Sequence, residues 1–427
     1  MSRLADMLKS RRKRLSKLID FPILLRSGDR KSRNFPANTY PFRASSHFLY
    51  FAGLSLPDAA IRIEGDRLTL FLDDPDPASA LWHGESPTRD QIALEIGADA
   101  AYPLSDLARF PSASIDNPEL IKVIVELRLI HDESAIAEIR KAIAVTVEAH
   151  RAGMQATLKA QTEAQIRAAM ESVILSHNMT CAYNSIVTVH GEVLHNEQYH
   201  HAVERSDLVL ADVGAETQSG WASDITRTWS ASGAFSPSQR AIYQVVLEAH
   251  DRAIEKIRPG IEYRDIHLLT CETLAEGLIE LGILRGRAAD LVDQDAHALF
   301  FPHGIGHLLG LDVHDMEDLG DIAGYETGRS RSSRFGLGYL RLDRPLKAGM
   351  IVTIEPGFYQ VPAILNDPER REKYREVVNW DRLTDFADVR GIRVEDDVLV
   401  TAESSEVLSI ALPTALEQIE NIVEKGS

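Results

Sequence analysis

The chain has 427 residues, of which 44% are hydrophobic and 26% charged, and its formal net charge at pH 7 is -18. This length exceeds one ordinary hydrophobic core and predicts two domains. The negative charge argues against nucleic acid as a partner, and no apolar run approaches the ~20 residues that cross a membrane. Two cysteines, Cys181 and Cys271, are too few for a disulfide framework and predict reduced thiols in a cytoplasmic protein.

The part of the chain up to residue 126 mixes short strand-like runs with turn residues, which predicts a small α/β domain. It opens with the basic stretch Arg11 to Arg14 and no signal-peptide core, and leucines at helical spacing predict a surface helix there. The strand-like runs are 60–64 and 68–72. Prolines and serines over 109–118 are typical of a linker. The predicted domains are 1–126 and 127–427.

Beyond the linker, amphipathic helical patterns alternate with strand-like runs. Ser236 followed by proline is typical of a capped helix start. Glu-Ala-His occurs at 148–150 and again at 248–250, and the order helix, helix, strands occurs twice, as in a pseudo-symmetric α+β domain. The predicted helices are 132–150, 162–175, 236–257 and 263–281, and the predicted strands are 207–212, 221–229, 350–354 and 391–400.

Asp212 and Asp224 stand in two apolar strands that we expect to form a hairpin, with its turn over 218–220. A turn centred near Gln218 would place the two aspartates opposite each other, where side chains lie ~5 Å apart and like charges are destabilising. A positive group is therefore expected between them. The alternative, two solvated aspartates, is weakened by the apolar runs around both, and this pair alone leaves metal binding open.

Three histidines lie in a glycine-rich stretch that begins at Phe301. His303 and His307 have the spacing of the zinc-protease helix motif, but Gly304 replaces its glutamate, and each glycine costs a helix ~1 kcal/mol. A loop or strand that brings the backbone close to a ligand fits better. With His314 nearby, a functional site is favoured over isolated core or surface histidines.

Two glutamates stand beside strongly β-forming runs, Glu355 after 351–354 and Glu395 within 391–400. A carboxylate there is costly to bury unless it is paired or binds metal. Alternation along the strand places Arg393 and Glu395 on one face. A surface ion pair between them is the alternative interpretation, and it does not account for Glu355.

The four carboxylates together carry four negative charges, which two divalent cations would neutralise. Oxygen donors with one imidazole favour Mn²⁺, with Co²⁺, Fe²⁺ or Zn²⁺ as alternatives, over a structural zinc site made of thiolates. Two metals ~3.5–4 Å apart can share a hydroxide and polarise a carbonyl, which is hydrolytic chemistry.

Four blocks carry a resemblance to a known family: 212–228, 303–315, 354–357 and 391–397. They resemble the signature blocks of the pita-bread metallopeptidases and are most similar to Xaa-Pro aminopeptidase (aminopeptidase P) and prolidase. The similarity runs from about residue 128 to 408, and Pro41 to Gly53 resembles the first domain of that family. The resemblance implies a creatinase-like N-terminal domain followed by a pseudo-symmetric pita-bread catalytic domain, an α+β chain overall.

The resemblance also implies roles for matching residues. Asp212 would hold one metal, Asp224 and Glu395 would bridge both, and His307 and Glu355 would complete the second. A bridging hydroxide would attack the carbonyl before proline, with Glu355 relaying the proton.

The residues expected to contact substrate also follow from the resemblance. His303 and His314 would position the peptide and stabilise the developing oxyanion. Three further residues match positions that line the substrate site: His195, Tyr359 and Arg393.

Two features depart from bacterial aminopeptidase P. The segment 320–346 is longer and looks more like prolidase, and Arg341 falls where prolidase has an arginine for the dipeptide carboxylate, a selective bidentate contact. An exposed loop arginine is the alternative, and both stay open. The N-terminal domain looks short, which leaves its oligomer contacts open. Trp82 nevertheless resembles a tryptophan that reaches a neighbouring subunit's site, which implies a homodimer or homotetramer.

The leading hypothesis is an Xaa-Pro aminopeptidase that acts on peptides of three or more residues with proline second. The runner-up is prolidase, which acts on Xaa-Pro dipeptides and is distinguished by Arg341. An inactive pita-bread binding module and a metal-free creatinase-like hydrolase are disfavoured because all five ligands are present. Methionine aminopeptidase lacks the preceding domain.

Overall fold

The computed structural model describes residues 3–426, which form two compact units. The first contains the chain up to Ser134 and the short segment Gln218–Trp221, and the second contains the rest from Ala135 onward. The predicted linker 109–118 lies within the first unit, where Ala113 forms a β-bridge with Ile23. The boundary predicted at residue 126 falls inside helix α5 (Pro118–Arg128). The Tyr50 hydroxyl donates a hydrogen bond to the Leu127 carbonyl and so links α5 to α2 (Ser46–Ala52) in the first unit.

The first unit is built on a four-stranded sheet in the order β1-β4-β5-β6, in which β5 and β6 pair in parallel and the other neighbours are antiparallel. Strands β4 and β5 confirm the two strand-like runs of the sequence. The strands are β1 (Ile23–Gly28), β4 (Ala59–Glu64), β5 (Arg67–Phe71) and β6 (Ala100–Tyr102). The main helices are α1 (Arg3–Leu15), α2 (Ser46–Ala52), α4 (Arg89–Ile96) and α5.

Helix α1 confirms the helix expected near the N-terminus. Leu8 and Leu15 are buried on its apolar face. Two residues of the basic stretch are buried as well: Arg11 pairs with Asp132 at 2.7 Å, and Arg12 Nη2 donates to the Gly97 carbonyl at 3.0 Å. Part of the basic stretch therefore fastens α1 within the first unit and does not face solvent.

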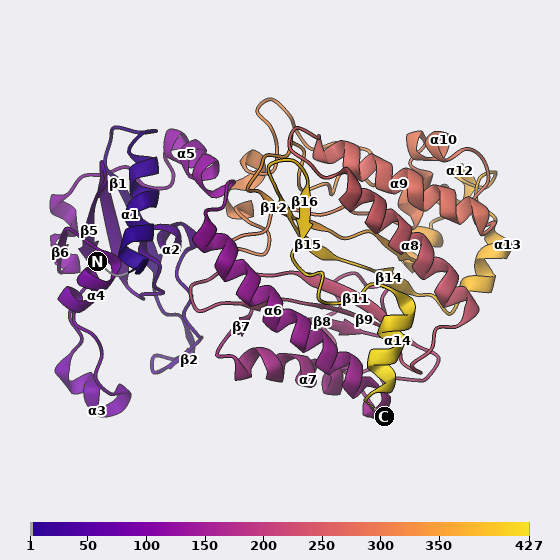
Figure 1. The fold of residues 1–427 in the computed structure, drawn as a ribbon, viewed down its shortest axis with the longest axis horizontal. Helices are drawn as coiled ribbons and strands as arrows, with labels where there is room; N and C mark the ends of the chain where they lie inside the picture. Colours follow the sequence, from indigo (N-terminus) through magenta and orange to yellow (C-terminus); the bar gives the residue numbers. More distant parts are fainter. Residues whose placement is uncertain (1–2, 427) are drawn as a thin grey trace. The chain divides into compact units, whose positions relative to one another are not determined.

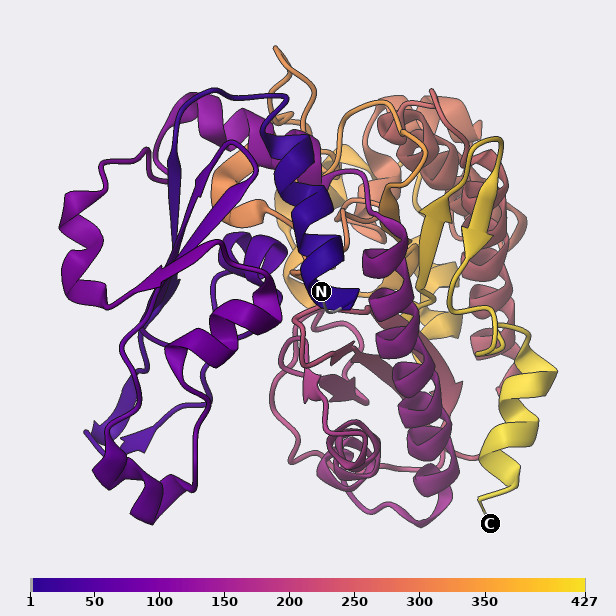
Figure 2. The same cartoon turned by 60° about the vertical axis from the view of Figure 1, so that its left-hand side comes forward.

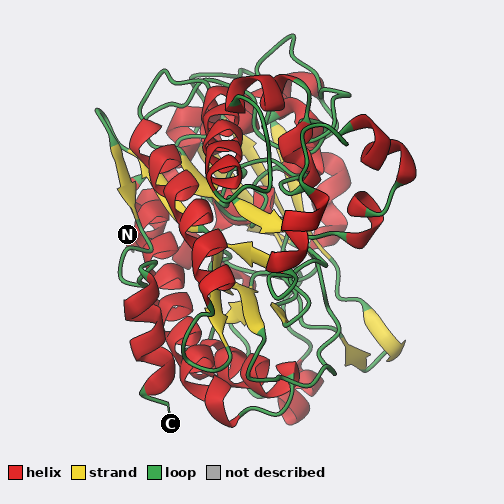
Figure 3. Ribbon diagram, turned by 90° about the vertical axis from the view of Figure 1, so that its right-hand side faces the viewer, coloured by secondary structure: helices red, strands yellow, loops and turns green. Residues whose placement is uncertain are grey.

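The second unit repeats the order helix, helix, strands, as the sequence predicted. Figures 1 and 2 show the two helix pairs, and Figure 3 shows helices (red) flanking the strands (yellow). The first half holds α6 (Glu133–Ala156), α7 (Glu163–Ser176) and the sheet β11-β9-β8. The second half holds α8 (Pro237–Lys256), α9 (Tyr263–Glu280) and the sheet β12-β15-β16. No helix within residues 3–426 combines the length and the apolar character of a membrane span.

The predicted hairpin exists, but its register differs from the expected one. Strand β9 (Leu208–Val213) pairs antiparallel with β11 (Ile225–Ser230), and Asp212 lies opposite Thr226, not opposite Asp224. The register is set beyond the strand ends, where Ser223 N donates to the Ala215 carbonyl at 3.0 Å. Asp224 stands two residues before Thr226 and shares its face of the sheet, because alternate residues point the same way.

The strand predicted over 391–400 is broken into two. Strand β14 (Gly391–Arg393) pairs with β13 (Gly357–Tyr359), whereas β15 (Asp396–Val400) pairs with β12 (Ile351–Ile354). The chain therefore changes partner at Glu395, which bridges to Thr226 of β11. This bridge joins the sheets of the two halves at a carboxylate.

Candidate active site

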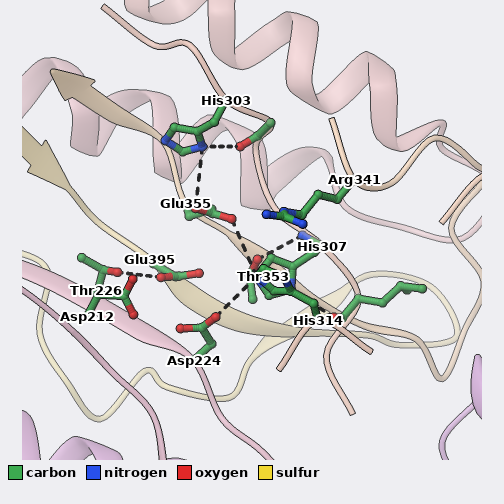
Figure 4. Close-up of polar contacts among 12 residues, drawn as sticks. Asp212, Asp224, Thr226, His303, His307, His314, Arg341, Thr353, Glu355 and Glu395 are labelled. Carbon is green, nitrogen blue, oxygen red and sulfur yellow. Dashed lines mark hydrogen bonds and ion pairs between the residues drawn. The ribbon is translucent and has the colours of Figure 1, made fainter. Parts of the chain in front are cut away.

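A pocket of about 350 Å³ in the second unit gathers most of the residues singled out from the sequence. Figure 4 shows the carboxylates and histidines of this pocket pointing toward one another from separate segments. The predicted residues that line it are Asp212, Asp224, Glu355, Glu395, His195, His303, His307, His314, Arg341 and Arg393.

Asp212 is buried with its charge compensated. Its Oδ2 accepts from Arg393 Nη2 at 2.6 Å, and its Oδ1 accepts from the Tyr183 hydroxyl at 2.5 Å. Burial disfavours the ionised carboxylate, but Arg393 and the Tyr183 hydroxyl outweigh it, and the pKa of Asp212 is lowered. The alternative interpretation, a surface ion pair between Arg393 and Glu395, is therefore wrong. Both residues are buried, and Arg393 pairs with Asp212.

Asp224, His307 and Glu395 each offer a donor atom within 4.8 Å of the other two. His307 Nε2 lies 3.4 Å from Asp224 Oδ2. Burial and the charge of Asp212 raise the pKa of Asp224 well above its ordinary value. Burial and the charge of Asp224 do the same to the pKa of Glu395.

Glu355 follows β12 and faces two histidines. Its Oε1 lies 3.8 Å from His307 Nε2, and its Oε2 lies 3.8 Å from His303 Nδ1. Burial raises the pKa of Glu355 to about 7, and the charges of Asp224 and Asp212 add to this effect.

The loop that carries His307 is held against β12 by backbone contacts. Thr353 N donates to the His307 carbonyl at 3.0 Å, and Glu355 N donates to the Ile305 carbonyl at 2.8 Å. A side chain at Gly306 would collide with the Thr353 carbonyl, so glycine permits this close approach. The glycine-rich stretch is thus an extended loop, as the sequence predicted, and not a zinc-protease helix.

His303 belongs to a chain of hydrogen bonds. Arg393 Nη1 donates to the Tyr359 oxygen at 3.1 Å, the Tyr359 hydroxyl lies 2.9 Å from His303 Nε2, and His303 Nδ1 donates to the Gly304 carbonyl at 2.8 Å. Since Nδ1 faces a carbonyl, Nε2 accepts from Tyr359 in the neutral ring. Burial, together with the charge of Arg393, lowers the pKa of His303 to about 3, so the imidazole is neutral.

The remaining predicted residues lie at the edge of the site or apart from it. The centroid of the His314 ring lies 4.2 Å from that of the His307 ring, and the two rings are tilted by 58° to each other. Arg341 is 34% exposed and pairs with a residue that the sequence reading did not single out, Glu317. His195 is exposed at the pocket wall. Trp82, in α3 (Ala80–His83) of the first unit, is 79% exposed, and its role in a neighbouring subunit stays a prediction.

Besides Glu317, the sequence did not single out three further residues at the site. The Tyr183 hydroxyl lies 2.5 Å from both Asp212 Oδ1 and Asp224 Oδ1, and it comes from a loop without a local pattern. The Thr226 hydroxyl donates to Glu395 Oε2 at 2.6 Å. Its position two residues after Asp224 on a strand was a usable signal, because alternation puts both on one face. Asp397 accepts from the Asp224 backbone N–H at 3.1 Å.

The residues present fit a divalent-metal site. Four buried or nearly buried carboxylates converge on the pocket, and the buried guanidinium of Arg393 lies among them. The raised pKa values of Asp224, Glu355 and Glu395 reflect negative charge that burial leaves unbalanced, which bound cations would offset. Oxygen donors with one imidazole are ligands that divalent metals accept.

A second group, His267, Cys271 and His297, is also buried but differs in chemistry. Cys271 Sγ lies 3.5 Å from His267 Nε2, a distance that a sulfur hydrogen bond satisfies. Burial raises the pKa of the Cys271 thiol and lowers the pKa of His267 to about 3, so both groups are neutral. This group is a neutral part of the core, separate from the carboxylate site.

Comparisons of the sequence with family models and with known proteins agree on one family. Residues 137–402 match metallopeptidase family M24, and residues 8–121 match the aminopeptidase P N-terminal domain. The chain is 31% identical over 422 residues to the probable Xaa-Pro aminopeptidase pepP of Talaromyces marneffei, covering 90% of this chain and 88% of that protein. It is 32% identical over 414 residues to a probable Xaa-Pro aminopeptidase of Fusarium vanettenii, covering 88% of this chain and 86% of that one.

Solved structures agree with this family. Aminopeptidase PepP of Pseudomonas aeruginosa superposes with a TM-score of 0.80 at 27% identity, covering 99% of this chain and 98% of that one. Aminopeptidase P of Escherichia coli with the inhibitor Pro-Leu superposes with a TM-score of 0.82 at 26% identity, covering 100% and 99%. The expected α+β architecture, with an aminopeptidase P N-terminal domain before a pita-bread domain, is confirmed. The chain therefore belongs to metallopeptidase family M24, as a metallo-aminopeptidase of the aminopeptidase P group.

Proposed function

We propose that this protein is an Xaa-Pro aminopeptidase that hydrolyses the bond between the first residue of a peptide and a proline in second place. The observation that carries the proposal is the convergence of Asp212, Asp224, Glu355 and Glu395 with His307 in one pocket. The names of relatives that align over 90% of this chain support the same substrate class.

Two divalent metal ions, Mn²⁺ being the first to test, would be held by Asp212, Asp224, His307, Glu355 and Glu395. When bound, such ions activate water and polarise the scissile carbonyl. Arg393 and Tyr183 hold the Asp212 carboxylate in a fixed orientation. Thr226 does the same for Glu395, and such supporting hydrogen bonds tune metal ligands strongly.

The protein's own groups would handle the proton and the peptide. Glu355 lines the pocket between His303 and His307, where its carboxylate would take up a proton and return it to the leaving nitrogen of proline. The neutral His303 ring, fixed by Tyr359, would position the peptide together with His314, whose ring lies beside that of His307.

We also propose a cytoplasmic homodimer or homotetramer. Both cysteines are free thiols in the structure, which supports a reducing compartment. The exposed Trp82 ring would reach the site of a neighbouring subunit. Sedimentation of the wild type and of Trp82→Ala tests this assembly, and a wild-type monomer would contradict it.

The experiment that tests the function uses metal-depleted protein reloaded with Mn²⁺. We expect cleavage of Gly-Pro-Pro, no cleavage of the matched control Gly-Ala-Pro, and loss of activity on chelation. Hydrolysis of neither peptide by protein that binds the metal would overturn the proposal. Prolidase is the second candidate because Arg341 lines the pocket, and preference for the dipeptide Gly-Pro would favour it.

A further inference from the structure

Arg341 brings a positive charge to the pocket wall, but that charge already has a partner. Its Nη1 donates to both carboxylate oxygens of Glu317, at 2.9 and 2.7 Å. The two side chains are exposed to a similar degree, 34% for Arg341 and 35% for Glu317. Figure 4 shows Arg341 reaching toward Glu355 and His307.

Glu317 is held by a second pocket residue as well. His314 Nδ1 lies 3.2 Å from Glu317 Oε2, so the carboxylate joins Arg341 to His314. Burial works against its charge, but His314 and Arg341 outweigh it, and the pKa of Glu317 is lowered to about 2. Glu317 therefore remains ionised, and charge-assisted contacts of this kind are stronger than neutral ones.

The backbone places Glu317 where it can make both contacts. It opens η5 (Glu317–Ile322), a 3₁₀ segment kinked at Gly320, directly after Met316, whose φ of 63° is left-handed. The turn at Met316 brings Glu317 back toward His314, three positions earlier, and the Glu317 N–H donates to the His314 carbonyl. The acid is thus fixed beside the pocket by the local fold.

We propose that Glu317 occupies Arg341 and thereby makes the pocket select peptides in which the proline is followed by another residue. The inference rests on the proposed function. A dipeptide ends in a carboxylate on its proline, and that carboxylate would have to displace Glu317 from Arg341 against like-charge repulsion. A longer peptide presents a neutral amide at the same position and leaves the pair intact.

The test compares the dipeptide Gly-Pro with its neutral amide, which differs only in the terminal charge. In Glu317→Gln, Arg341 keeps its charge and loses its ionic partner. We expect the ratio of kcat/KM for Gly-Pro to that for the amide to rise about tenfold, mainly through a lower KM for Gly-Pro. The reason is that Arg341 becomes free to form a charge-assisted hydrogen bond with the carboxylate of the dipeptide, and one such bond corresponds to about this change in affinity.

Two further variants separate this effect from structural damage. The double variant Glu317→Gln, Arg341→Gln is expected to return the ratio to its wild-type value, because the freed cation is gone. The matched control is Asp321→Asn, which lies on the same segment and pairs with Arg331 at 2.7 Å, and it is expected to leave the ratio unchanged.

General damage at the site would lower both rates together and leave their ratio unaltered. An unchanged ratio in a Glu317→Gln variant that cleaves the amide as fast as the wild type, with Gly-Pro-Pro still cleaved by the wild type, would overturn this inference alone. A wild type that cleaves neither Gly-Pro-Pro nor Gly-Pro would overturn the proposed function and this inference with it.

Discussion

The two halves of the second unit share one plan and differ in the charges they bury. Each half begins with a helix that carries Glu-Ala-His, with His150 on α6 and His250 on α8, and both histidines are buried. His150 Nε2 donates to the Ile225 carbonyl at 2.9 Å. His250 Nε2 instead lies 3.0 Å from a carboxylate oxygen of Asp396.

This difference in partner gives the two histidines opposite behaviour. Burial and the charge of Arg227 lower the pKa of His150 to about 4. Burial also acts against charge on His250, but Asp251 and Asp396 outweigh it and raise its pKa. A repeated backbone position therefore does not determine the charge of its side chain, which here depends on the next residue of the helix, Asp251, and on Asp396 of the neighbouring strand.

The site itself combines the two halves. The hairpin of the first half contributes Asp212 and Asp224, and the second half contributes Glu355 and Glu395 near its strand ends. Asp396 stands beside Glu395 but is paired with Arg227 at 2.8 Å. Among the pocket acids, Asp212 is likewise paired, with Arg393, whereas the raised pKa values of Asp224, Glu355 and Glu395 show that the scaffold supplies them with fewer counter-charges.

The largest effect is expected when one pocket acid is neutralised in either half. Asp224→Asn and Glu395→Gln should each lower kcat/KM by more than the roughly 10- to 100-fold that loss of a supporting hydrogen bond costs, and should lower the bound metal measured by elemental analysis. The exposed acid Asp385, paired with Arg382, provides a control in Asp385→Asn. Full activity and full metal content in Asp224→Asn would contradict the ligand assignment.

A smaller effect is expected from the hydroxyl that joins the two halves. Thr226 donates to Glu395 and accepts from Arg393 Nε at 3.0 Å, so Thr226→Val should reduce kcat/KM by roughly 10- to 100-fold and weaken metal binding. Thr228, on the same face of β11, contacts the Arg393 backbone, and Thr228→Val should retain more activity. Equal losses in the two variants would assign the effect to strand packing.

The smallest effects concern stability and differ in sign between the halves. The raised pKa of His250 stabilises the fold fully below the ordinary histidine value of about 6.5, and this contribution is lost as pH rises through the raised value. The lowered pKa of His150 instead makes stability fall as pH drops from about 6.5 toward 4, by about 3 kcal/mol at most.

Denaturant unfolding across this pH range separates the two cases. His150→Gln should flatten the decline on the acid side, whereas His250→Gln should lose most stability below pH ~6.5 and least at higher pH. The same pH dependence in both variants would show that Asp396 does not distinguish the halves.

Local sequence patterns were sufficient for much of this architecture. The helices α6 to α9, the hairpin strands and the extended glycine-rich loop were predicted because their periodicity, caps and glycines act over a few residues. The carboxylates Glu355 and Glu395 were predicted as site residues because each stands within or directly after a β-forming run. Tyr183 and Glu317 were not found, since neither has a local pattern and both act through partners distant in sequence or across a turn.

The sequence by itself determined the order of elements and the residue types that enter the site, because hydrophobic periodicity and turn chemistry are local. Only the tertiary structure decided which residues pair. Asp212 lies opposite Thr226 in the sheet, Arg393 forms an ion pair with Asp212, and Arg341 forms an ion pair with Glu317. Alternation along a strand sets the face on which a side chain points. Its partner depends on which strand lies alongside and in what register, and that is settled by contacts between distant segments.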